Sequence, residues 1–388
     1  MSLGLLLAGI LASVFVGFNI GGSSTGIAWG PAVGADLLKK TSAAALMTFF
    51  VFLGGATVGR NVMQTLSEGI ITVEISLASG VAVLFFIGLG ILVANVFGVP
   101  VPTSMTTVGA IAGLGLATDT LNYETIAWIL SWWIVTPIIG FWIGATIGRY
   151  VYPELNQRYR IEKSDGPLLT LDRTGNMPRP TFGPNTTWGE LGSTALVLVI
   201  GCYMAFSAGA SNVPNAVAPL VSSGALEPNP AIVIATVAIG LGGFTIARRT
   251  MESVGSELSE IPLLAALIVM TTAATITTFL SWIGIPISLV MASVMTIVGL
   301  GWGRATRPVS MKEAMRRNVD NEIAPGALTT EPKTPVTKIG ESESQEVLDA
   351  GSLFNPRAIV KYVSMWIIGP AMSTGLAYVF FLAVPFVA

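Results

Sequence analysis

Histidine is absent from the 388-residue sequence, and cysteine occurs only once, at Cys202. The lack of histidine removes the usual proton shuttle and the commonest metal ligand in proteins. One cysteine can form neither an intrachain disulfide nor a thiolate metal cluster. Charged residues are scarce as well, at 11% of the chain. These absences disfavour an enzyme, and we expect neither an organic cofactor nor a nucleic-acid partner.

Hydrophobic residues make up 52% of the sequence, and the mean hydropathy is +0.72. A helix needs about 20 apolar residues to cross the hydrocarbon core of a bilayer. Runs near this length occur throughout the chain, at residues 75–96, 126–147, 191–206, 231–246, 261–280 and 362–387. The sequence therefore predicts an all-α, multi-pass protein of the cell membrane, with the lipid bilayer as its surroundings.

The chain contains an internal repeat. Three pairs of segments follow the same order, with offsets of 192, 188 and 186 residues: 17–26 with 209–219, 54–63 with 242–251, and 98–115 with 284–301. We expect five membrane crossings in the first half. An odd number of crossings makes the two halves inverted repeats, the architecture in which a site between them can face either side alternately.

Positive charge predicts the orientation, because loops rich in Lys and Arg stay in the cytoplasm. Most basic residues lie in two long polar segments, and the second segment is rich in Pro, Glu, Ser and Thr, which predicts a flexible loop. We expect both long loops in the cytoplasm and both termini outside. The predicted units are a first repeat at 1–149, a polar loop at 150–187, the first part of the second repeat at 188–303, a flexible loop at 304–356, and a last transmembrane helix at 357–388.

Two of the repeated segments, 17–26 and 209–219, place small and polar residues inside apolar helices. Non-helical backbone within a bilayer is tolerated only where it lines a cavity or a site, and Pro214 and Pro219 disfavour a regular helix. We expect both helices to break or re-enter here, so that half-helices present free N–H groups to an anion. The alternative is that the small residues only pack helices and the hydroxyls bond back to their own helices.

Two proline-containing turns, at Pro102 and Pro286, form a further pair of polar interruptions. Each proline stands shortly before Thr or Ser, residues typical of a helix start. Neither the turns nor the expected breaks contain a carboxylate, so their amides, hydroxyls and carboxamides fit a hydrated tetrahedral oxyanion better than an organic cation. The predicted substrate-binding residues are Asn19, Gly21, Gly22, Ser23, Ser24, Thr103, Ser104, Ser211, Asn212, Asn215 and Ser288.

Two arginines, Arg60 and Arg248, occupy matching positions in the repeat. Charged side chains within a membrane are functional candidates by default, which makes both arginines candidates for coupling transport to H⁺ or Na⁺. The competing interpretation is that each guanidinium reaches the membrane surface from a helix end.

These motifs resemble those of the inorganic phosphate transporter (PiT) family. Each of that family's inverted halves carries a Gly-Ala-Asn-Asp-Val-x-Asn-Ser/Ala motif and a Pro-Val-Ser-Thr-Thr turn. Residues 209–219 are similar to the second copy, with Ser211 in the Asn position and Asn212 in the Asp position. In the first copy Asn19 is in place, whereas Ile20 stands where the family has Asp.

Both motif aspartates are therefore missing. In that family, these aspartates are associated with sodium binding. The resemblance implies a sodium site near Asn19, Asn212 and Asn215, and the missing carboxylates count against it. The sulfate permease branch of the same family is more similar, since it also carries an Asn-Ile-Gly-x-Ser stretch like residues 19–23.

The resemblance implies secondary active transport of sulfate or inorganic phosphate by alternating access, as a cation-coupled symport. Sulfate is favoured because the predicted site offers no carboxylate to accept a proton from phosphate. The alternatives are a Na⁺-coupled inorganic phosphate symporter and an uncoupled anion channel or uniporter. Families with this architecture often pair, so a homodimer is an expected assembly.

Overall fold

The computed structural model describes residues 3–34, 37–96, 102–152, 154–155, 169–172, 179–183, 186–245, 263–305 and 356–384. Almost all of these residues are helical, and six of the described helices are long and apolar enough to cross a membrane. A seventh span results if the bent pair at 40–56 and 59–69 is counted as one. The expected all-α, polytopic architecture is confirmed.

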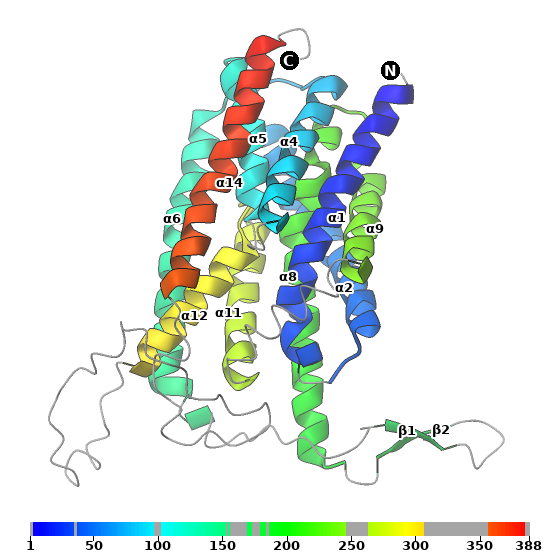
Figure 1. Ribbon diagram of the computed structural model, residues 1–388, viewed down its shortest axis with the longest axis vertical. Helices are drawn as coiled ribbons and strands as arrows, with labels where there is room; N and C mark the ends of the chain where they lie inside the picture. The colour runs from blue at the N-terminus through cyan, green and yellow to red at the C-terminus, as the bar shows by residue number, and fades with distance from the viewer. Residues whose placement is uncertain are drawn as a thin grey trace, which may run out of the picture.

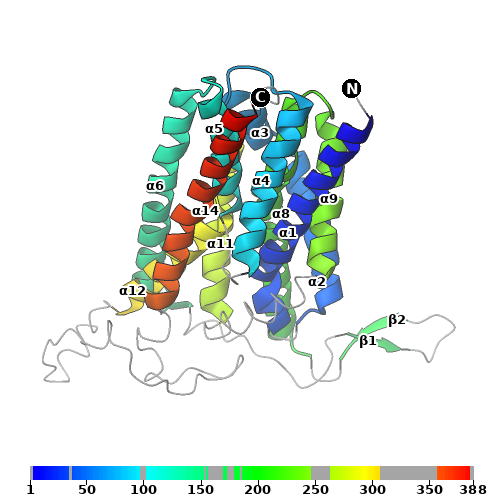
Figure 2. The same cartoon turned by 45° about the horizontal axis from the view of Figure 1, so that its top comes forward.

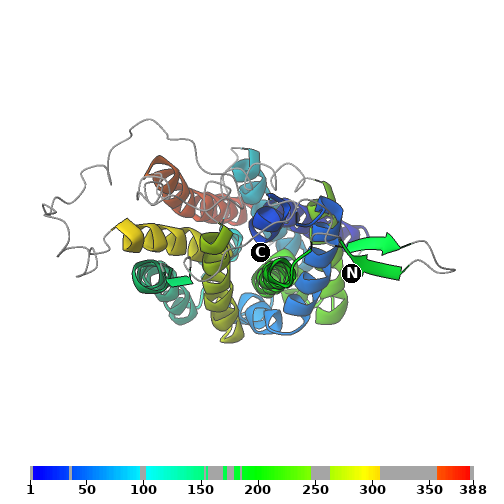
Figure 3. The same cartoon turned by 90° about the horizontal axis from the view of Figure 1, so that it is seen from below.

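One group of helices surrounds the longest helix, α8 (Trp188–Ser222). It comprises α1 (Leu3–Gly34), α2 (Lys40–Ala56) and α9 (Pro228–Thr245), which pack against α8 and against one another. The view along the bundle places α8 between α1, α2 and α11 (Figure 3). This position gives α8 contact with most of the elements that build the site.

After α2 the chain bends by 62° into α3 (Gly59–Gln64), which continues as the π-helical turn η1 (Thr65–Gly69). A second group contains α6 (Tyr123–Thr146), which ends in the π-helical turn η2 (Ile147–Val151). In this group α6 packs against α12 (Leu289–Ala305), and α14 (Pro356–Ala383) packs against α5 (Thr103–Ala117) (Figure 2).

Four helices form two hairpins that lie in opposite halves of the bundle. α4 (Leu77–Val96) and α5 lie in the half nearest the two chain ends, whereas α11 (Leu263–Trp282) and α12 lie in the other half (Figure 1). Ile71 before α4 pairs with Leu121 after α5, so this hairpin returns to the end from which it entered. The expectation of five crossings in the first half is therefore wrong, because α4 and α5 turn back inside the bundle.

α1 and α8 run without interruption through both segments in which the sequence predicted a break. The prediction of half-helices starting within 17–26 and 209–219 is therefore wrong. The physical reason in α1 is that polar side chains bond back to their own helix, as Asn19 does when its Nδ2 donates to the Phe15 carbonyl oxygen at 2.9 Å. Within the described ranges, the helical path is interrupted at the bend at 57–58 and at the turn 283–288 between α11 and α12.

Helix α8 contains Pro214 and Pro219 and remains helical at both. It also packs closely against α2. A Cβ at Gly209 would overlap the carbonyl oxygen of Val51, and a Cβ at Gly54 would overlap that of Phe206. Small residues let transmembrane helices approach this closely and gain dispersion contacts, which offsets the hydrogen bonds that the prolines remove.

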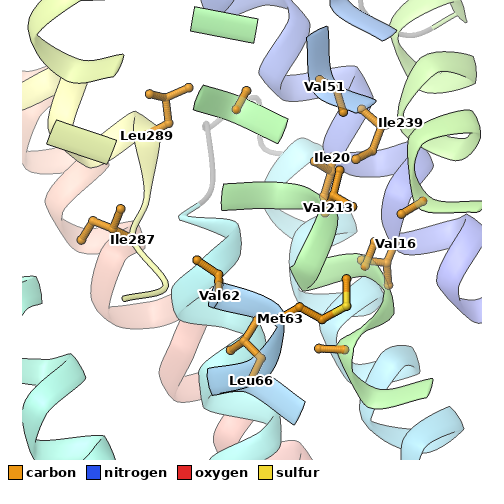
Figure 4. Close-up of a cluster of buried hydrophobic side chains, with 14 of the residues drawn as sticks. Val16, Ile20, Val51, Val62, Met63, Leu66, Val213, Ile239, Ile287 and Leu289 are labelled. Atoms are coloured by element: carbon orange, nitrogen blue, oxygen red, sulfur yellow. The ribbon is translucent and has the colours of Figure 1, made fainter. Parts of the chain in front are cut away.

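The apolar core lies between α1, α2, α3, α8 and α9 (Figure 4). Ile20 of α1, Val213 of α8 and Met63 of α3 are buried members of this core. Ile287, on the segment that leads into α12, and Leu289, the first residue of α12, are also buried. Burial of these two side chains keeps the turn between α11 and α12 inside the bundle.

A short antiparallel pair, β1 (Leu169–Asp172) and β2 (Arg179–Phe182), lies outside the helical bundle at the end opposite the chain ends (Figure 1). It falls within the predicted polar loop 150–187, where the sequence predicted no strand. The predicted flexible loop 304–356 lies almost wholly outside the described residues.

Candidate functional site

Three polar side chains of α8 point into the interior between the two hairpins. Ser211 and Asn215 lie one helical turn apart and are fully buried, and Asn212 is 5% exposed. Residues four apart share one face of a helix, which explains why Ser211 and Asn215 reach the same neighbours. Helix α8 therefore supplies one wall of a polar cluster within an otherwise apolar bundle.

The start of α5 supplies the facing wall. Thr103 Oγ1 donates to Asn212 Oδ1 at 2.6 Å, and Asn215 Nδ2 donates to Ser104 Oγ at 3.0 Å and to Thr103 Oγ1 at 3.4 Å. Thr103 and Ser104 are both buried. The predicted turn at Pro102 is thus a true helix start, and it brings residues more than 100 positions apart in the sequence into contact.

The turn before α12 completes the cluster. The carbonyl oxygen of Ile287 accepts from Ser211 Oγ at 2.8 Å and from Ser104 Oγ at 3.0 Å, and these two hydroxyls lie 3.5 Å apart. Ser288 is buried and accepts from the Met291 amide at 3.4 Å, a capping contact of the kind its position predicts. Both hairpins therefore meet α8 at one place.

α1 contributes Ser24, whose hydroxyl accepts from Asn212 Nδ2 at 3.2 Å. We use the term polar cluster for Ser24, Thr103, Ser104, Ser211, Asn212 and Asn215 together with the Ile287 carbonyl. Its members come from α1, α5, α8 and the turn between α11 and α12. The structure thus brings together six of the predicted site residues.

The other predicted residues of α1 have different surroundings. Asn19 is buried and receives bonds from Asn95 Nδ2 on α4, at 3.3 Å to its carbonyl oxygen and 3.4 Å to Oδ1. Ser23 donates to the Ile20 carbonyl oxygen at 3.0 Å, within its own helix. A Cβ at Gly21 would overlap the backbone of α9, so Gly21 serves the approach of two helices. Gly22 is buried in the same stretch of α1.

The polar cluster carries no formal charge, and the local field comes from hydroxyl, carboxamide and backbone dipoles. α5 and α12 both begin at the cluster. The first amides of a helix have no intrahelical acceptor, and the helix dipole places partial positive charge there. The N-cap of α5 is Pro102, whose side chain makes no capping bond to these amides. Two helix starts therefore make the cluster favourable for an anion.

The hydrogen bonds fix the orientation of the Asn215 carboxamide. The Thr103 hydroxyl donates to Asn212 and the Ser104 hydroxyl donates to Ile287, so both oxygens face Asn215 as acceptors. A hydroxyl has a single proton to donate, and Asn215 must therefore present its NH₂ group to them. Its Oδ1 is buried and has no hydrogen-bond partner among the described residues.

The two arginines are not members of the polar cluster. Arg60 is exposed, and its guanidinium donates to Asn229 Oδ1 at 2.6 Å and to the carbonyl oxygen of Ala56, the last residue of α2, at 2.7 Å. Arg248 lies outside the described residues. The structure thus places Arg60 just after the bend that follows α2. An arginine is tolerated at such a helix boundary because its long side chain can keep the guanidinium exposed.

Several polar groups in the interior of the bundle lacked any signal in the sequence. Trp133 of α6 donates its indole N–H to the carbonyl oxygen of Pro286 at 2.9 Å, and nothing in a membrane-spanning run singles out one tryptophan. The hydroxyls of Thr277 and Ser281, one turn apart on α11, are buried without a partner among the described residues. The sequence shows the Thr and Ser residues of α11, but it does not show which side of the helix faces the interior of the bundle.

A metal site built from charged or soft ligands does not occur in the part of the chain that the structure describes. No group of three His, Cys, Asp or Glu side chains is close enough there to bind an ion. Any ion at the polar cluster would contact neutral oxygens and amide groups.

Comparison with known proteins identifies related sequences over most of the chain. The model of the phosphate transporter family matches residues 20–377. The sulfate permease CysP of Bacillus subtilis is 30% identical over 312 residues, which cover 80% of this chain and 81% of that protein. The chloroplastic inorganic phosphate transporter 2-1 of Arabidopsis thaliana is 25% identical over 78% of this chain and 66% of its own length.

A solved structure has the same fold. It is described as the sodium-dependent phosphate transporter, superposes with a TM-score of 0.65, and covers 98% of this chain and 100% of its own. Its sequence is 19% identical, so the likeness concerns the arrangement of the helices.

Proposed function

Because this chain belongs to the phosphate transporter family, we propose that it carries a small tetrahedral inorganic oxyanion across the cell membrane by alternating access. The observation that carries the proposal is the uncharged polar cluster at the starts of α5 and α12. It lies inside the bundle, where buried polar groups are costly unless they have partners or a function. A transporter needs such a site between its two sides.

The donors of the polar cluster suit an oxyanion. Thr103, Ser104 and Ser211 offer hydroxyl protons, and Asn212 and Asn215 offer amide protons, all buried. Hydrogen bonds to an ionised acceptor are about twice as strong as those between neutral groups. Half-helix N-termini also point at anionic substrates in other secondary transporters. An organic cation would find no carboxylate among these residues.

We favour sulfate over phosphate as the substrate. Sulfate has no proton to donate at neutral pH, whereas phosphate retains one or two, and the cluster has no carboxylate to accept such a proton. The similarity to a sulfate permease supports this choice. Coupling to a cation as a symport completes the proposal, because uphill transport of an anion needs a driving ion.

Alternating access requires an inner and an outer gate around one site. We propose that the α4–α5 and α11–α12 hairpins are equivalent parts of two inverted repeats, and that movement of one repeat against the other exposes the cluster to each side in turn. Their position in opposite halves of the bundle supports this assignment (Figure 1). The long loops are proposed to be cytoplasmic and both termini outside, and the assembly is proposed to be a homodimer.

A second candidate is a Na⁺-coupled inorganic phosphate symporter. The observation that favours it is the buried Oδ1 of Asn215, which has no donor among the described residues. Hard cations take oxygen ligands of this kind, and the P–OH group of phosphate would also satisfy it. An uncoupled anion channel or uniporter is the third candidate, since Ile20 and Asn212 stand where the family has aspartate.

Uptake by purified protein in liposomes separates these candidates. Radiolabelled sulfate and phosphate are each tested with an inward Na⁺ gradient, with an inward proton gradient, and with neither. We expect accumulation of sulfate that depends on a cation gradient. Phosphate accumulation driven by Na⁺ would favour the second candidate, and flux that no gradient drives uphill would favour the third.

One pair of variants links the uptake to the polar cluster. Ser104→Ala removes a hydroxyl from the cluster, and we expect it to raise the KM for the transported anion. The matched control is Ser131→Ala, because the exposed Ser131 hydroxyl bonds only to the Ala127 carbonyl oxygen within α6. Equal KM values for the two variants, in correctly inserted protein, would refute the site.

A further inference from the structure

The carbonyl oxygen of Ile287 occupies an unusual position in the polar cluster. It accepts two hydroxyl protons at once, from Ser211 at 2.8 Å and from Ser104 at 3.0 Å. Both donors belong to the residues that the proposed function assigns to the anion. The acceptor belongs to the turn between α11 and α12, which is an element of the opposite hairpin.

Each serine hydroxyl has one proton, so it donates one strong hydrogen bond at a time. A hydroxyl that donates to Ile287 cannot donate to an anion. The carbonyl oxygen also carries partial negative charge and would repel an oxyanion placed beside it. The Ile287 carbonyl and a bound anion therefore compete for the same two protons.

We propose that the Ile287 carbonyl is an internal ligand of the anion site, and that the transported anion must displace it from Ser104 and Ser211. This inference rests on the proposed function. Displacement releases the turn between α11 and α12 from α5 and α8, so binding of the anion and loosening of one hairpin are the same event. The substrate itself thus loosens the contact between the two hairpins.

Trp133 is the positioning residue that holds the carbonyl in place. Its indole N–H donates to the carbonyl oxygen of Pro286, the residue before Ile287, at 2.9 Å. On the other side of the turn, Asn61 of α3 donates its Nδ2 to the carbonyl oxygen of Trp282. The Ile287 side chain is fully buried, so the turn is fixed at three places.

The proposal predicts an effect with an unusual sign. Loss of the Trp133 hydrogen bond weakens the hold on the turn, which lowers the free energy that the anion must supply to displace Ile287. The KM for the anion should fall. A residue that only supported the shape of the site would have the opposite effect, because its loss would disorder the site and raise the KM.

The variant Trp133→Phe removes the indole N–H and keeps an aromatic ring, and Trp132→Phe is its matched control. Trp132 is the neighbouring tryptophan of α6, and its buried indole N–H has no hydrogen-bond partner among the described residues. Both variants and the wild type are reconstituted, and the KM is measured with radiolabelled sulfate and with radiolabelled phosphate. Thermal unfolding in detergent is measured with and without each anion.

We expect Trp133→Phe to lower the KM of the transported anion by about two- to tenfold, the factor that corresponds to one net hydrogen bond. Its Tm without anion should fall, while the rise in Tm caused by the anion should grow. Trp132→Phe should leave the KM and the anion-induced rise in Tm as in the wild type. An unchanged or raised KM for Trp133→Phe would overturn the proposal.

If Trp133→Phe does not insert, Asn61→Leu provides the same test, because it removes the other hydrogen bond to the turn. It should lower the KM in the same way, and a raised KM would again overturn the internal ligand. Failure of the proposed function is distinguishable from failure of this inference. Wild-type protein that transports neither anion overturns both, whereas wild-type transport with no fall in KM overturns the internal ligand alone.

Discussion

Replacement of Asn212 by aspartate adds a negative charge to the centre of the polar cluster. Asn212 is 5% exposed, its Oδ1 accepts from Thr103 Oγ1 at 2.6 Å, and its Nδ2 donates to Ser24 Oγ at 3.2 Å. A carboxylate keeps the bond from Thr103 and loses the donor to Ser24. The main change is therefore electrostatic repulsion of a bound anion.

The size of this repulsion follows from the geometry. An anion that accepts the Thr103 proton in place of residue 212 would lie about 2.7 Å from Oγ1, which puts it about 5 Å from the new charge. At an effective dielectric constant of about 20, two unit charges at this distance repel by about 3 kcal/mol. That free energy corresponds to a KM raised by about two orders of magnitude, and a dianion such as sulfate would be affected more.

Uptake into liposomes in Na⁺-free medium measures this effect. The control variant is Asn212→Leu, which has a similar volume and no charge. Each hydrogen bond that the leucine cannot form should cost the site about 1 kcal/mol of stabilising free energy. Addition of Na⁺ should restore uptake by the aspartate variant in part, and should not restore uptake by the leucine variant. A KM for the aspartate variant no higher than that for the leucine variant would refute an anion at this position.

Three further substitutions test other parts of the account. Gly209→Ala forces a Cβ onto the Val51 carbonyl oxygen and should lower stability by about 1–3 kcal/mol, seen as a lower Tm in detergent, whereas Gly192→Ala meets nothing within 4 Å and should leave Tm unchanged. Ser24→Ala removes the acceptor of Asn212 Nδ2 and should raise the KM for the anion by up to about tenfold. Its control, Ser23→Ala, loses only a bond within α1, and equal KM values for the two variants would count against the polar cluster as the anion site. Arg60→Gln should leave the KM and the gradient dependence of uptake unchanged, because Arg60 is exposed and bonds Asn229; loss of gradient dependence would restore its role in coupling.

The two proline-containing turns were predictable from the sequence. Thr103 begins α5, and Ser288 stands directly before α12. Proline and a following hydroxyl residue mark helix starts because proline needs no amide partner there and the hydroxyl can cap free amides. Such local chemistry acts within a few residues, so it can be seen without knowledge of the fold.

The breaks expected in 17–26 and 209–219 were not formed, and the reason lies in an ambiguity of the residues themselves. A polar side chain in an apolar helix can line a gap in that helix, or it can bond to a carbonyl four residues back and leave the helix intact. Asn19 and Thr25 do the latter, at 2.9 Å to Phe15 and 2.8 Å to Gly21. Packing against neighbouring helices decides between the two outcomes.

The hairpins and their partners were beyond the reach of sequence patterns. α4 has 20 residues, a length that fits a membrane crossing as well as a hairpin arm. The pairing of Thr103 with Asn212, and of Trp133 with Pro286, joins residues 109 and 153 positions apart. Such contacts depend on how helices assemble, and no periodicity within one helix records them.

The most direct test of the central claim is to locate a bound oxyanion. Selenate and arsenate are tetrahedral analogues of sulfate and phosphate, and each can be found in a crystal by its anomalous scattering. The account predicts one strong peak within hydrogen-bonding distance, about 3 Å, of the Thr103 and Ser104 hydroxyls, with the Ile287 carbonyl moved away from Ser104 and Ser211. A peak at another place in the bundle, or an anion bound with the Ile287 contacts intact, would contradict the account.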